Sequence, residues 1–346
     1  MRSFAGSSRV AFSVGVVSLL TSLAVPAHAV TIDWVTVGDP GNAADTAPAG
    51  FGAVADAFRI MKFEFTNQQY TDFLNSVDAS GTNPNSVYNT NMGSNARGGI
   101  SFTSGAASGS KYAAKTNMSD KPVNYVSWFD AARVSNWLMN GATGTSSTET
   151  GAYTLVGGQT SGTAPAANPG ATFYVPPEHQ WYKAAYYKGG STNAGYWNYA
   201  TQSDTAPTAV TAGSTGIGSA GSTGNFANYN SAASWNGQTG NVTTVGTNGR
   251  ASAYDAFDMS GNLYEWNDPT GAAGSSFRLR VGGDWSNSAS ALSSSLRPAN
   301  DASFESNIIG FRLASPVAVP EPSTYAMALA GLACGGYSIF RRRKQT

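Results

Sequence analysis

The chain has 346 residues and a formal net charge of zero, from 20 Lys and Arg against 20 Asp and Glu. Its interior contains no run of basic side chains, which excludes a nucleic-acid partner because phosphates demand clustered Lys and Arg. The one cysteine, Cys334, cannot form an internal disulfide, so the body must rely on its core or on bound metal.

The N-terminus has the pattern of an export signal. Arg2 and Arg9 precede an apolar run that ends at Pro26 and the small residues around His28. This order predicts a secretory signal peptide over residues 1–29, cut by signal peptidase after Ala29. An N-terminal membrane helix is the alternative, but the apolar run is short for a bilayer.

One strand and three helices are predicted in the body. Residues 58–65 alternate enough for a strand, and residues 66–69 can cap a helix that follows them. A second helix begins at Ser127 and a third at Pro177. The apolar side chains at helical spacing are Tyr70, Phe73 and Leu74, then Trp128, Ala131, Val134 and Leu138, then Trp181, Ala184 and Ala185.

Long polar segments separate these elements. Residues 79–120, 141–172 and 201–250 are rich in Gly, Ser, Thr, Asn and Ala, and we expect them to be loops. Loops of this length count against a compact domain unless a ligand orders them or the fold is rich in loops. No internal repeat and no second domain boundary is evident.

The C-terminus carries a second signal with three parts. Pro320, Glu321 and Pro322 precede an apolar segment over residues 325–340 and a basic tail that starts at Arg341. The order resembles the PEP-CTERM sorting signal, here residues 319–346, which a membrane protease called an exosortase reads. The apolar segment is marginal for spanning a bilayer, so it predicts a transient anchor; a permanent membrane helix is the alternative.

Both terminal signals affect the charge of the body. They contain six of the basic residues, Arg2, Arg9 and residues 341–344, and one acidic residue, Glu321. The body therefore has 14 basic against 19 acidic residues and is mildly acidic.

A series of motifs in the body resembles the sulfatase-modifying-factor family, whose founding enzyme generates formylglycine in sulfatases. The matching segments are residues 64–70 (EFTNQQY), 122–131 (PVNYVSWFDA), 174–185 (YVPPEHQWYKAA), 258–266 (DMSGNLYEW), 281–285 (VGGDW), Arg297 and 310–312 (GFR). The resemblance implies a single α+β domain over residues 30–314, irregular and rich in loops, with a fold related to C-type lectins. Residues 315–318 would then be a linker.

The known chemistry of the family is absent from this sequence. The positions of its two copper-binding cysteines correspond to about Asn287 and Leu292, and neither side chain binds Cu(I) as a thiolate does. The related iron-dependent sulfoxide synthases need three histidines, but only His28 and His179 exist. We therefore expect no copper, no catalytic residue and no organic cofactor, and favour a protein that is not an enzyme.

A few polar residues deserve a comparison of roles. His179 begins a helix, where a surface or capping role is more common than catalysis. Ser127 with His179 could suggest a hydrolase triad, but no nucleophile elbow accompanies them. Glu64 and Glu178 are expected to cap helices or to pair with an arginine such as Arg312.

Eight aromatic residues fall into two groups. Trp128, Trp181, Trp266 and Trp285 lie inside the motifs and are expected to fill the core. Tyr196, Trp197, Tyr199 and Trp235 lie in polar segments, where exposed rings could stack on sugars.

The resemblance also implies structural calcium, a hard cation that prefers oxygen ligands. The first site would use the carboxylates of Asp258 and Glu265 and the carbonyls of Gly261 and Leu263. The alternative is that Asp258 is a turn residue and Glu265 a packed carboxylate. A second site would use Asn228 and the carbonyl of Tyr229. The loop 231–240 offers only Asn236 as a further ligand and contains no Asp or Glu, so we expect this site to be weaker.

Taken together, these features predict an exported, exosortase-sorted protein that passes through an inner-membrane intermediate to the cell surface or the medium. Its body would bind extracellular polysaccharide or protein without catalysis. One alternative is an enzyme, either a formylglycine-generating-enzyme-related oxidoreductase or one of unrecorded activity; another is an envelope component with no small ligand.

Overall fold

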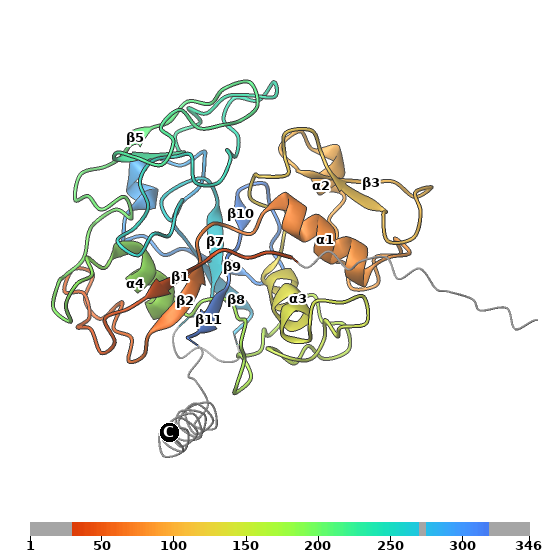
Figure 1. The fold of residues 1–346 in the computed structure, drawn as a ribbon, viewed down its shortest axis with the longest axis horizontal. Coiled ribbons are helices and arrows are strands. Elements are labelled where there is room, and N and C mark those ends of the chain that lie inside the picture. Colours follow the sequence, from red (N-terminus) through yellow and green to blue (C-terminus); the bar gives the residue numbers. More distant parts are fainter. Residues whose placement is uncertain (1–29, 270–274, 318–346) are drawn as a thin grey trace, which may run out of the picture.

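The computed structural model describes residues 30–269 and 275–317, in which short strands and helices alternate with long loops (Figure 1). The helices are α1 (Asn67–Val77), α2 (Asn91–Ser94), α3 (Trp128–Met139) and α4 (Glu178–Tyr186), with one 3-10 helix, η1 (Ala289–Leu292). The strands are β1 (Trp34–Val37), β2 (Phe58–Met61), β3 (Ile100–Phe102), β4 (Tyr112–Ala114), β5 (Thr208–Ala209), β6 (Phe226–Ala227), β7 (Tyr264–Asn267), β8 (Phe277–Val281), β9 (Ala299–Asp301), β10 (Ile309–Gly310) and β11 (Ala314–Pro316).

All three predicted helices are confirmed, and two have capping boxes. The Thr66 hydroxyl accepts a hydrogen bond from the backbone N–H of Gln69, and the side-chain oxygen of Gln69 accepts one from the backbone N–H of Thr66. Ser127 and Asp130 make the same reciprocal pair at α3. These bonds satisfy backbone N–H groups that a helix start otherwise leaves unpaired.

Two small sheets form the centre of the molecule. In the first, β2 lies between β1 and β11 and is antiparallel to both, so the two ends of the described chain meet on one strand. The second has the order β10-β7-β8-β9, with β10 parallel to β7. The predicted strand 58–65 is thus shorter than expected, because the chain leaves the sheet after Met61.

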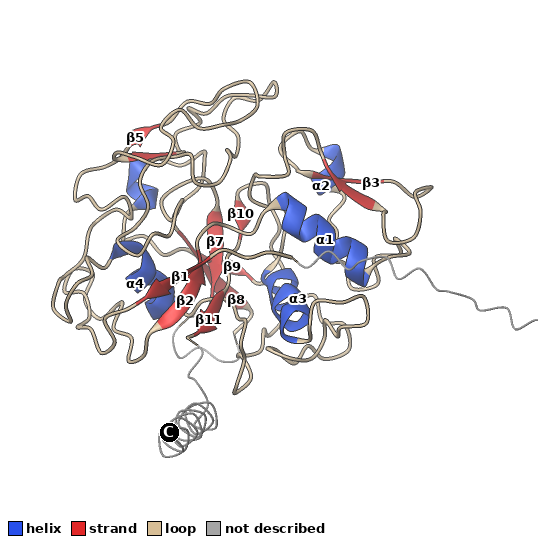
Figure 2. Ribbon diagram, viewed as in Figure 1, coloured by secondary structure: helices blue, strands red, loops and turns tan. Residues whose placement is uncertain are grey.

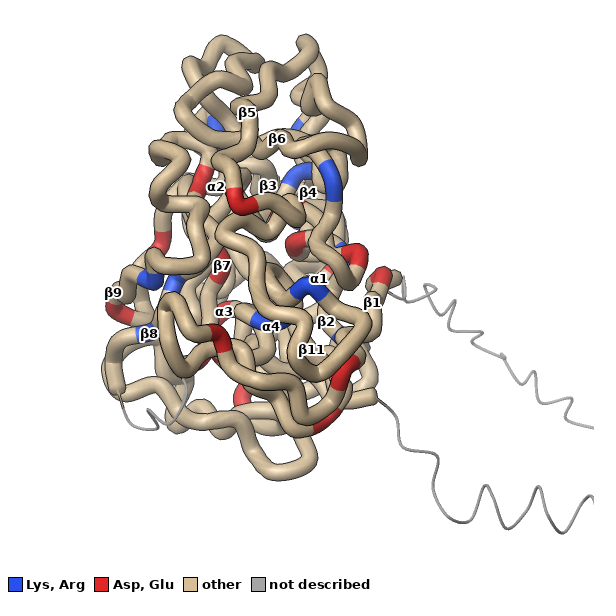
Figure 3. The backbone as a smooth tube through the Cα atoms, turned by 90° about the vertical axis from the view of Figure 1, so that its left-hand side faces the viewer, with Lys and Arg blue, Asp and Glu red and all other residues tan. Residues whose placement is uncertain are grey.

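Most of the described chain is loop, as expected from the composition (Figure 2). Residues 141–172 contain no helix or strand, while residues 79–120 contain only α2, β3 and β4. The fold is therefore an irregular α+β domain. Between residues 205 and 249 the sequence has no charged side chain at all. This segment includes β5 and β6, and the loops above β5 carry no charged residue in Figure 3.

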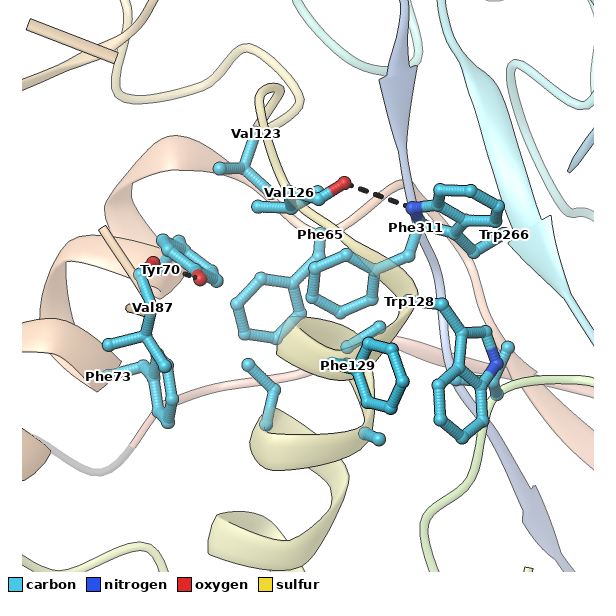
Figure 4. Close-up of a cluster of buried hydrophobic side chains, with 14 of the residues drawn as sticks. Phe65, Tyr70, Phe73, Val87, Val123, Val126, Trp128, Phe129, Trp266 and Phe311 are labelled. Carbon is cyan, nitrogen blue, oxygen red and sulfur yellow. Dashed lines mark hydrogen bonds between the residues drawn. The ribbon is translucent and has the colours of Figure 1, made fainter. Parts of the chain in front are cut away.

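The largest core cluster lies where α1 and α3 meet the second sheet (Figure 4). The rings of Phe65 and Phe311 stack with their centres 5.0 Å apart. The indole of Trp266 donates to the carbonyl of Val126 at 3.0 Å. The core role predicted for the motif tryptophans is confirmed, since Trp128, Trp181 and Trp266 are at most 1% exposed and Trp285 is 6% exposed.

The chain boundaries need one adjustment. Ser315 and Pro316 pair with β2, so the folded domain continues two residues beyond the expected end at 314. The predicted signal peptide, the processing residues Ala29, Pro320, Glu321 and Pro322, and the apolar segment 325–340 lie outside the described residues. Within residues 30–269 and 275–317, none of the helices has the length and apolar character needed to cross a bilayer.

Candidate functional site

A buried ion pair joins two of the sequence motifs. The Glu265 carboxylate on β7 accepts hydrogen bonds from Arg312 Nε at 2.7 Å and from Arg312 Nη2 at 2.6 Å. The indole of Trp181 donates to the same carboxylate at 2.7 Å. Both charged side chains are almost fully buried. Arg312, the arginine named as an example of a partner for Glu64 or Glu178, thus pairs with Glu265, whereas Glu178 pairs with Arg297.

Two more carboxyl groups lie near this pair. Asp258 accepts from the backbone of Gly246 at 2.6 Å and from the side chain of Asn248 at 2.8 Å. Glu64 accepts from the side chain of Asn262 at 2.7 Å and from the backbone of Leu263 at 3.2 Å. Asp258 has a φ of 59°, a left-handed conformation that few residues other than Gly, Asn and Asp adopt. Its two hydrogen bonds hold the loop in this conformation.

The resulting cluster has three carboxyl groups and one guanidinium. Burial raises the pKa of Glu64 well above its usual range, and the neighbouring charges of Asp258 and Glu265 raise it further, while Arg312 opposes them. Burial also raises the pKa of Asp258. The cluster therefore favours holding a proton at carboxyl groups that water would leave ionised.

The first calcium set fits this geometry poorly. Gly261 has a φ of 88°, and a Cβ there would lie 2.4 Å from the Asn228 carbonyl oxygen, so only Gly fits this turn. Leu263 is fully buried. Glu265, however, already accepts three hydrogen bonds, and a cation at its carboxylate would lie beside the guanidinium of Arg312. Glu265 thus behaves as the packed carboxylate of the alternative interpretation.

Asn228 offers a better fit to a cation. It is fully buried, and its amide nitrogen donates to three oxygen acceptors, those of Asn241, Thr243 and Asn262. Its Oδ1 atom has no hydrogen-bond partner among the described residues. An unpaired buried carbonyl oxygen is the kind of ligand that calcium satisfies.

The other two expected members of this second site, Tyr229 and Asn236, make hydrogen bonds of their own. The Tyr229 hydroxyl donates to the Pro207 carbonyl at 2.6 Å, which fixes the residue whose backbone oxygen was predicted as a ligand. Asn236 is exposed, and its amide donates to the Ala96 carbonyl. No group of three His, Cys, Asp or Glu side chains suited to a metal occurs in the part of the chain that the structure describes.

The two residues that correspond to the family's cysteines, Asn287 and Leu292, both have structural contacts. Asn287 Oδ1 accepts from the backbone of Asp284 at 3.2 Å, which makes it a turn residue. Leu292 ends η1 and is fully buried, and its Cδ1 would lie 2.8 Å from a Cβ added at Gly283. Amide and aliphatic groups at these two positions cannot perform thiol chemistry.

Asp284 is a polar group that sequence reasoning missed. It is fully buried; one oxygen accepts from the backbone and hydroxyl of Ser286 at 2.7 and 2.6 Å, and Oδ2 has no partner among the described residues. Burial raises the pKa of Asp284. Nearby, the Arg280 guanidinium lies 4.5 Å from the centre of the Tyr264 ring. The available signal in the sequence was an acidic residue between Gly283 and Trp285 within the motif 281–285.

The remaining polar candidates have structural contacts. His179 Nδ1 accepts from the backbone of Gly52 at 3.3 Å, and burial lowers the pKa of His179. Ser127 caps α3 and donates to Asp130 at 2.7 Å, not to a histidine. Glu178 forms an ion pair with Arg297 at 3.1 Å.

The expectation of exposed sugar-stacking rings is corrected for Trp235. That indole is 6% exposed, donates to the Val242 carbonyl at 2.8 Å and is covered by Lys121. Tyr196 is half-buried and packs against Tyr187, with ring centres 4.9 Å apart. Tyr199 and Trp197 are half-buried, and Trp197 lies 4.2 Å from the Lys188 amine.

Comparison with protein families gives two matches. The model of the sulfatase-modifying factor enzyme 1-like domain matches residues 30–317, and that of the PEP-CTERM protein-sorting motif matches residues 318–344. Both resemblances drawn from the sequence are thereby confirmed. A search of curated proteins found no relative.

Three solved structures are similar to this chain at low sequence identity. CarF is 22% identical with a TM-score of 0.52, and the match covers 83% of this chain and 99% of CarF. Variable protein 1 of Treponema denticola is 18% identical with a TM-score of 0.46, over 83% of this chain and 95% of that one. PvdO of Pseudomonas aeruginosa is 19% identical with a TM-score of 0.42, over 83% and 92%. The likeness to CarF supports the fold alone.

Proposed function

Since the chain belongs to the sulfatase-modifying factor enzyme 1-like family and ends in a PEP-CTERM motif, we propose that it is an exosortase-sorted surface protein whose body binds a partner without catalysis. The observation that carries this proposal is the pair Asn287 and Leu292. They stand where the family's thiols are expected, one in a turn and one in the core.

Two small pockets among the described residues agree with this proposal. One is lined by Thr201, Asn248, Asp258 and Ser260, among others, and has room for about one water molecule. A second of similar size lies beside Tyr182, Tyr186 and Arg297. Neither could enclose a substrate side chain, whereas binding of a polymer needs only an open surface.

The partner that we propose is extracellular polysaccharide, bound by the uncharged loops between residues 205 and 249 and by neighbouring rings. Hydroxyl and amide groups in these loops can hydrogen-bond to sugars without ionic attraction. Of the two tryptophans considered for sugar stacking, Trp235 is buried and Trp197 is half-buried, so Trp197 is the indole that we propose to contact the sugar. A relation of the fold to C-type lectins, expected from the family, is part of the same proposal.

Two assays test the proposal. Incubation of the exported chain with a Cys-Pro-Ser-Arg peptide should yield no aldehyde above the background without protein, and turnover would favour the oxidoreductase alternative. A glycan array should show retention of the chain, and Trp197→Ala should weaken it roughly tenfold if one contact of about 1.4 kcal/mol is lost.

Trp34→Ala is the matched control for the array, because Trp34 is also half-buried beneath a cation, with Arg59 at 5.4 Å, but lies on β1. Equal binding by both variants would remove Trp197 from the site. Absence of any retained glycan would favour a protein partner or a purely structural role.

A further inference from the structure

The chain contains two Asp-Pro peptide bonds, and the structure surrounds them differently. One, Asp39–Pro40, follows β1, and the other, Asp268–Pro269, follows β7. An Asp-Pro bond is labile for two reasons. The Asp carboxylate can attack the carbonyl carbon of its own residue without having to find it, and the leaving nitrogen belongs to a tertiary amide.

The carbonyl of Asp39 lies beside a buried cation. Lys183 Nζ, on α4, donates to this carbonyl oxygen at 2.8 Å, and the Lys183 side chain is fully buried. Burial lowers the pKa of Lys183 to about 8, although the charge of Asp39 opposes the shift. The ammonium group is therefore placed to stabilise negative charge on this oxygen, and it gives up a proton more readily than an exposed lysine does.

The carboxylate of Asp39 is held at one of its two oxygens. Oδ2 accepts from the Tyr254 hydroxyl at 2.8 Å and from the backbone of Gly190 at 3.1 Å. Oδ1 accepts no hydrogen bond from residues 30–269 and 275–317. Asp39 also has a φ of 51°, in the left-handed region that few residues other than Gly, Asn and Asp adopt. One carboxylate oxygen thus remains able to act as a nucleophile.

The chain is anchored on both sides of this bond. Before it, β1 pairs with β2 along its whole length. After it, the backbone of Gly41 donates to the Val54 carbonyl at 2.9 Å. Pro40 itself is exposed, so water reaches the bond. A cut here would leave both pieces in the same fold, with the first piece held through β1.

The second Asp-Pro bond lacks this arrangement. Oδ1 of Asp268 accepts from the Trp128 indole at 2.8 Å and from Arg278 at 3.1 Å. Its Oδ2 accepts from the Tyr153 hydroxyl at 3.2 Å. The carbonyl of Asp268 accepts from the backbone of Glu178 at 2.7 Å rather than from a cation. Both oxygens of this carboxylate are occupied, so this bond is an internal comparison for the first.

We propose that the chain cuts itself between Asp39 and Pro40, with the Asp39 carboxylate as the nucleophile and Lys183 as the group that stabilises the oxyanion. Oδ1 forms a bond to the Asp39 carbonyl carbon, the bond from that carbon to Pro40 N breaks, and the departing nitrogen takes a proton from Lys183. The product at Asp39 is a cyclic anhydride. Water then opens the anhydride to two carboxylates, and the two protons released go to Lys183 and to the Pro40 amine.

The reaction adds one water molecule overall and occurs once in each chain. It needs no oxidant and no cofactor, and it is independent of the proposed binding of a partner. To test it, the purified full chain is incubated near neutral pH with protease inhibitors, denatured and analysed by mass spectrometry. A new N-terminus at Pro40 should accumulate with time, together with a fragment that ends at Asp39, and no new N-terminus should form at Pro269.

Three variants assign the roles. Asp39→Asn still offers an acceptor to Tyr254 but has no carboxylate, so the cut should disappear. Lys183→Met should slow the cut about a hundredfold, the usual effect of removing one donor to an oxyanion. Lys111→Met is the matched control. Its ammonium also donates to main-chain carbonyls, at 2.6 Å, but none of them belongs to an Asp-Pro bond, so this variant should be cut like the parent.

A second measurement needs no variant. Hydroxylamine opens an anhydride to a hydroxamate, so the fragment that ends at Asp39 should carry a hydroxamate when the parent is incubated with this reagent. A parent chain that stays uncut at Pro40, or a fragment without the hydroxamate, would overturn the proposal. So would equal cutting at the two Asp-Pro bonds, or a folded Lys183→Met that is cut at the rate of the parent.

Discussion

At the scale of single residues, the buried charges determine how the motifs depend on one another. Glu265 and Arg312 lie 47 positions apart and are both essentially inaccessible to solvent. Removal of one partner from such a pair leaves an uncompensated buried charge, which costs more than the pair itself contributes. The motifs at residues 258–266 (DMSGNLYEW) and 310–312 (GFR) are thus halves of one structural unit.

Glu265→Gln should destabilise the domain by about 3–5 kcal/mol, because Arg312 would keep its charge without a counter-ion. Urea unfolding followed by tryptophan fluorescence measures this. Glu178→Gln is the matched control: its pair with Arg297 is partly exposed, so the loss should be nearer 1 kcal/mol, roughly the value of a surface pair. Equal losses for the two variants would contradict the assignment.

Glu64 gives a pH dependence whose sign is opposite to that of an ordinary ion-paired carboxylate. Its folded pKa lies above the usual value of 4.5, so the folded state holds a proton that the unfolded chain releases. Above that value the free energy of unfolding should therefore fall as pH rises, until the folded pKa is passed. The slope should be shallower in Glu64→Gln, and urea unfolding at about pH 5 and about pH 8 would show it. An unchanged slope would mean that Glu64 is ionised in the fold.

At the scale of elements, the starts of the helices differ in how their first backbone N–H groups are capped. Thr66 and Ser127 each pair reciprocally with a residue three positions later, whereas Thr90, before α2, makes no capping bond through its side chain. The same residue type thus has different roles at two helix starts.

Thr66→Ala should cost about 1 kcal/mol of stability, within a usual range of about 0.5–2, because one N–H at the start of α1 loses its acceptor. Thr90→Ala should cost little, since its hydroxyl caps nothing. The difference between the two midpoints in urea is the quantity to measure. A larger loss for Thr90→Ala would refute the capping argument.

The sequence allowed the helices and the core tryptophans to be predicted, because periodicity and capping are local properties. It did not allow prediction of β10 beside β7, or of the ion pair between Glu265 and Arg312, because both depend on contacts between distant segments. Trp235 was misjudged for a related reason. Its neighbours in the chain are polar, yet it is buried by Lys121, which lies far from it in the sequence.

At the scale of the whole molecule, long loops require something to order them. Between residues 205 and 249 there are no charged side chains, so backbone and amide hydrogen bonds carry most of the polar organisation. The unpaired Asn228 Oδ1 lies inside this framework. A bound cation is one way to complete it, and calcium remains our prediction.

Calcium at a hundredfold excess over its dissociation constant should stabilise the domain by about 2.7 kcal/mol, and magnesium should have little effect. Thermal unfolding with calcium, magnesium or a chelator measures this. If Asn228 supplies a ligand, calcium should no longer raise the unfolding midpoint of Asn228→Ala. Calcium should still raise the midpoint of Glu265→Gln, although that variant unfolds at a lower temperature. The same midpoint in all three conditions would exclude a calcium site.

The sorting motif makes a prediction of its own. The PEP-CTERM match over residues 318–344 implies processing by an exosortase, so the surface form should end near Pro320, Glu321 and Pro322. Intact-mass measurement of the cell-surface protein is the test, with the membrane fraction as comparison. A surface form that still contains residues 341–344 would show that the tail is kept.

The position of β11 has a mechanical consequence for the membrane-held intermediate that we expect before the exosortase cuts the tail. The last strand is bonded to β2 through three registered pairs, and Arg59 on β2 donates to the Ser315 hydroxyl at 2.9 Å. A pull on the tail along the strand would load these pairs together in shear, whereas a sideways pull would open them in succession from Pro316. In that intermediate, a pull from the C-terminal segment would reach the central strand β2 first, which pairs with β1 on its other side, and only then the loops.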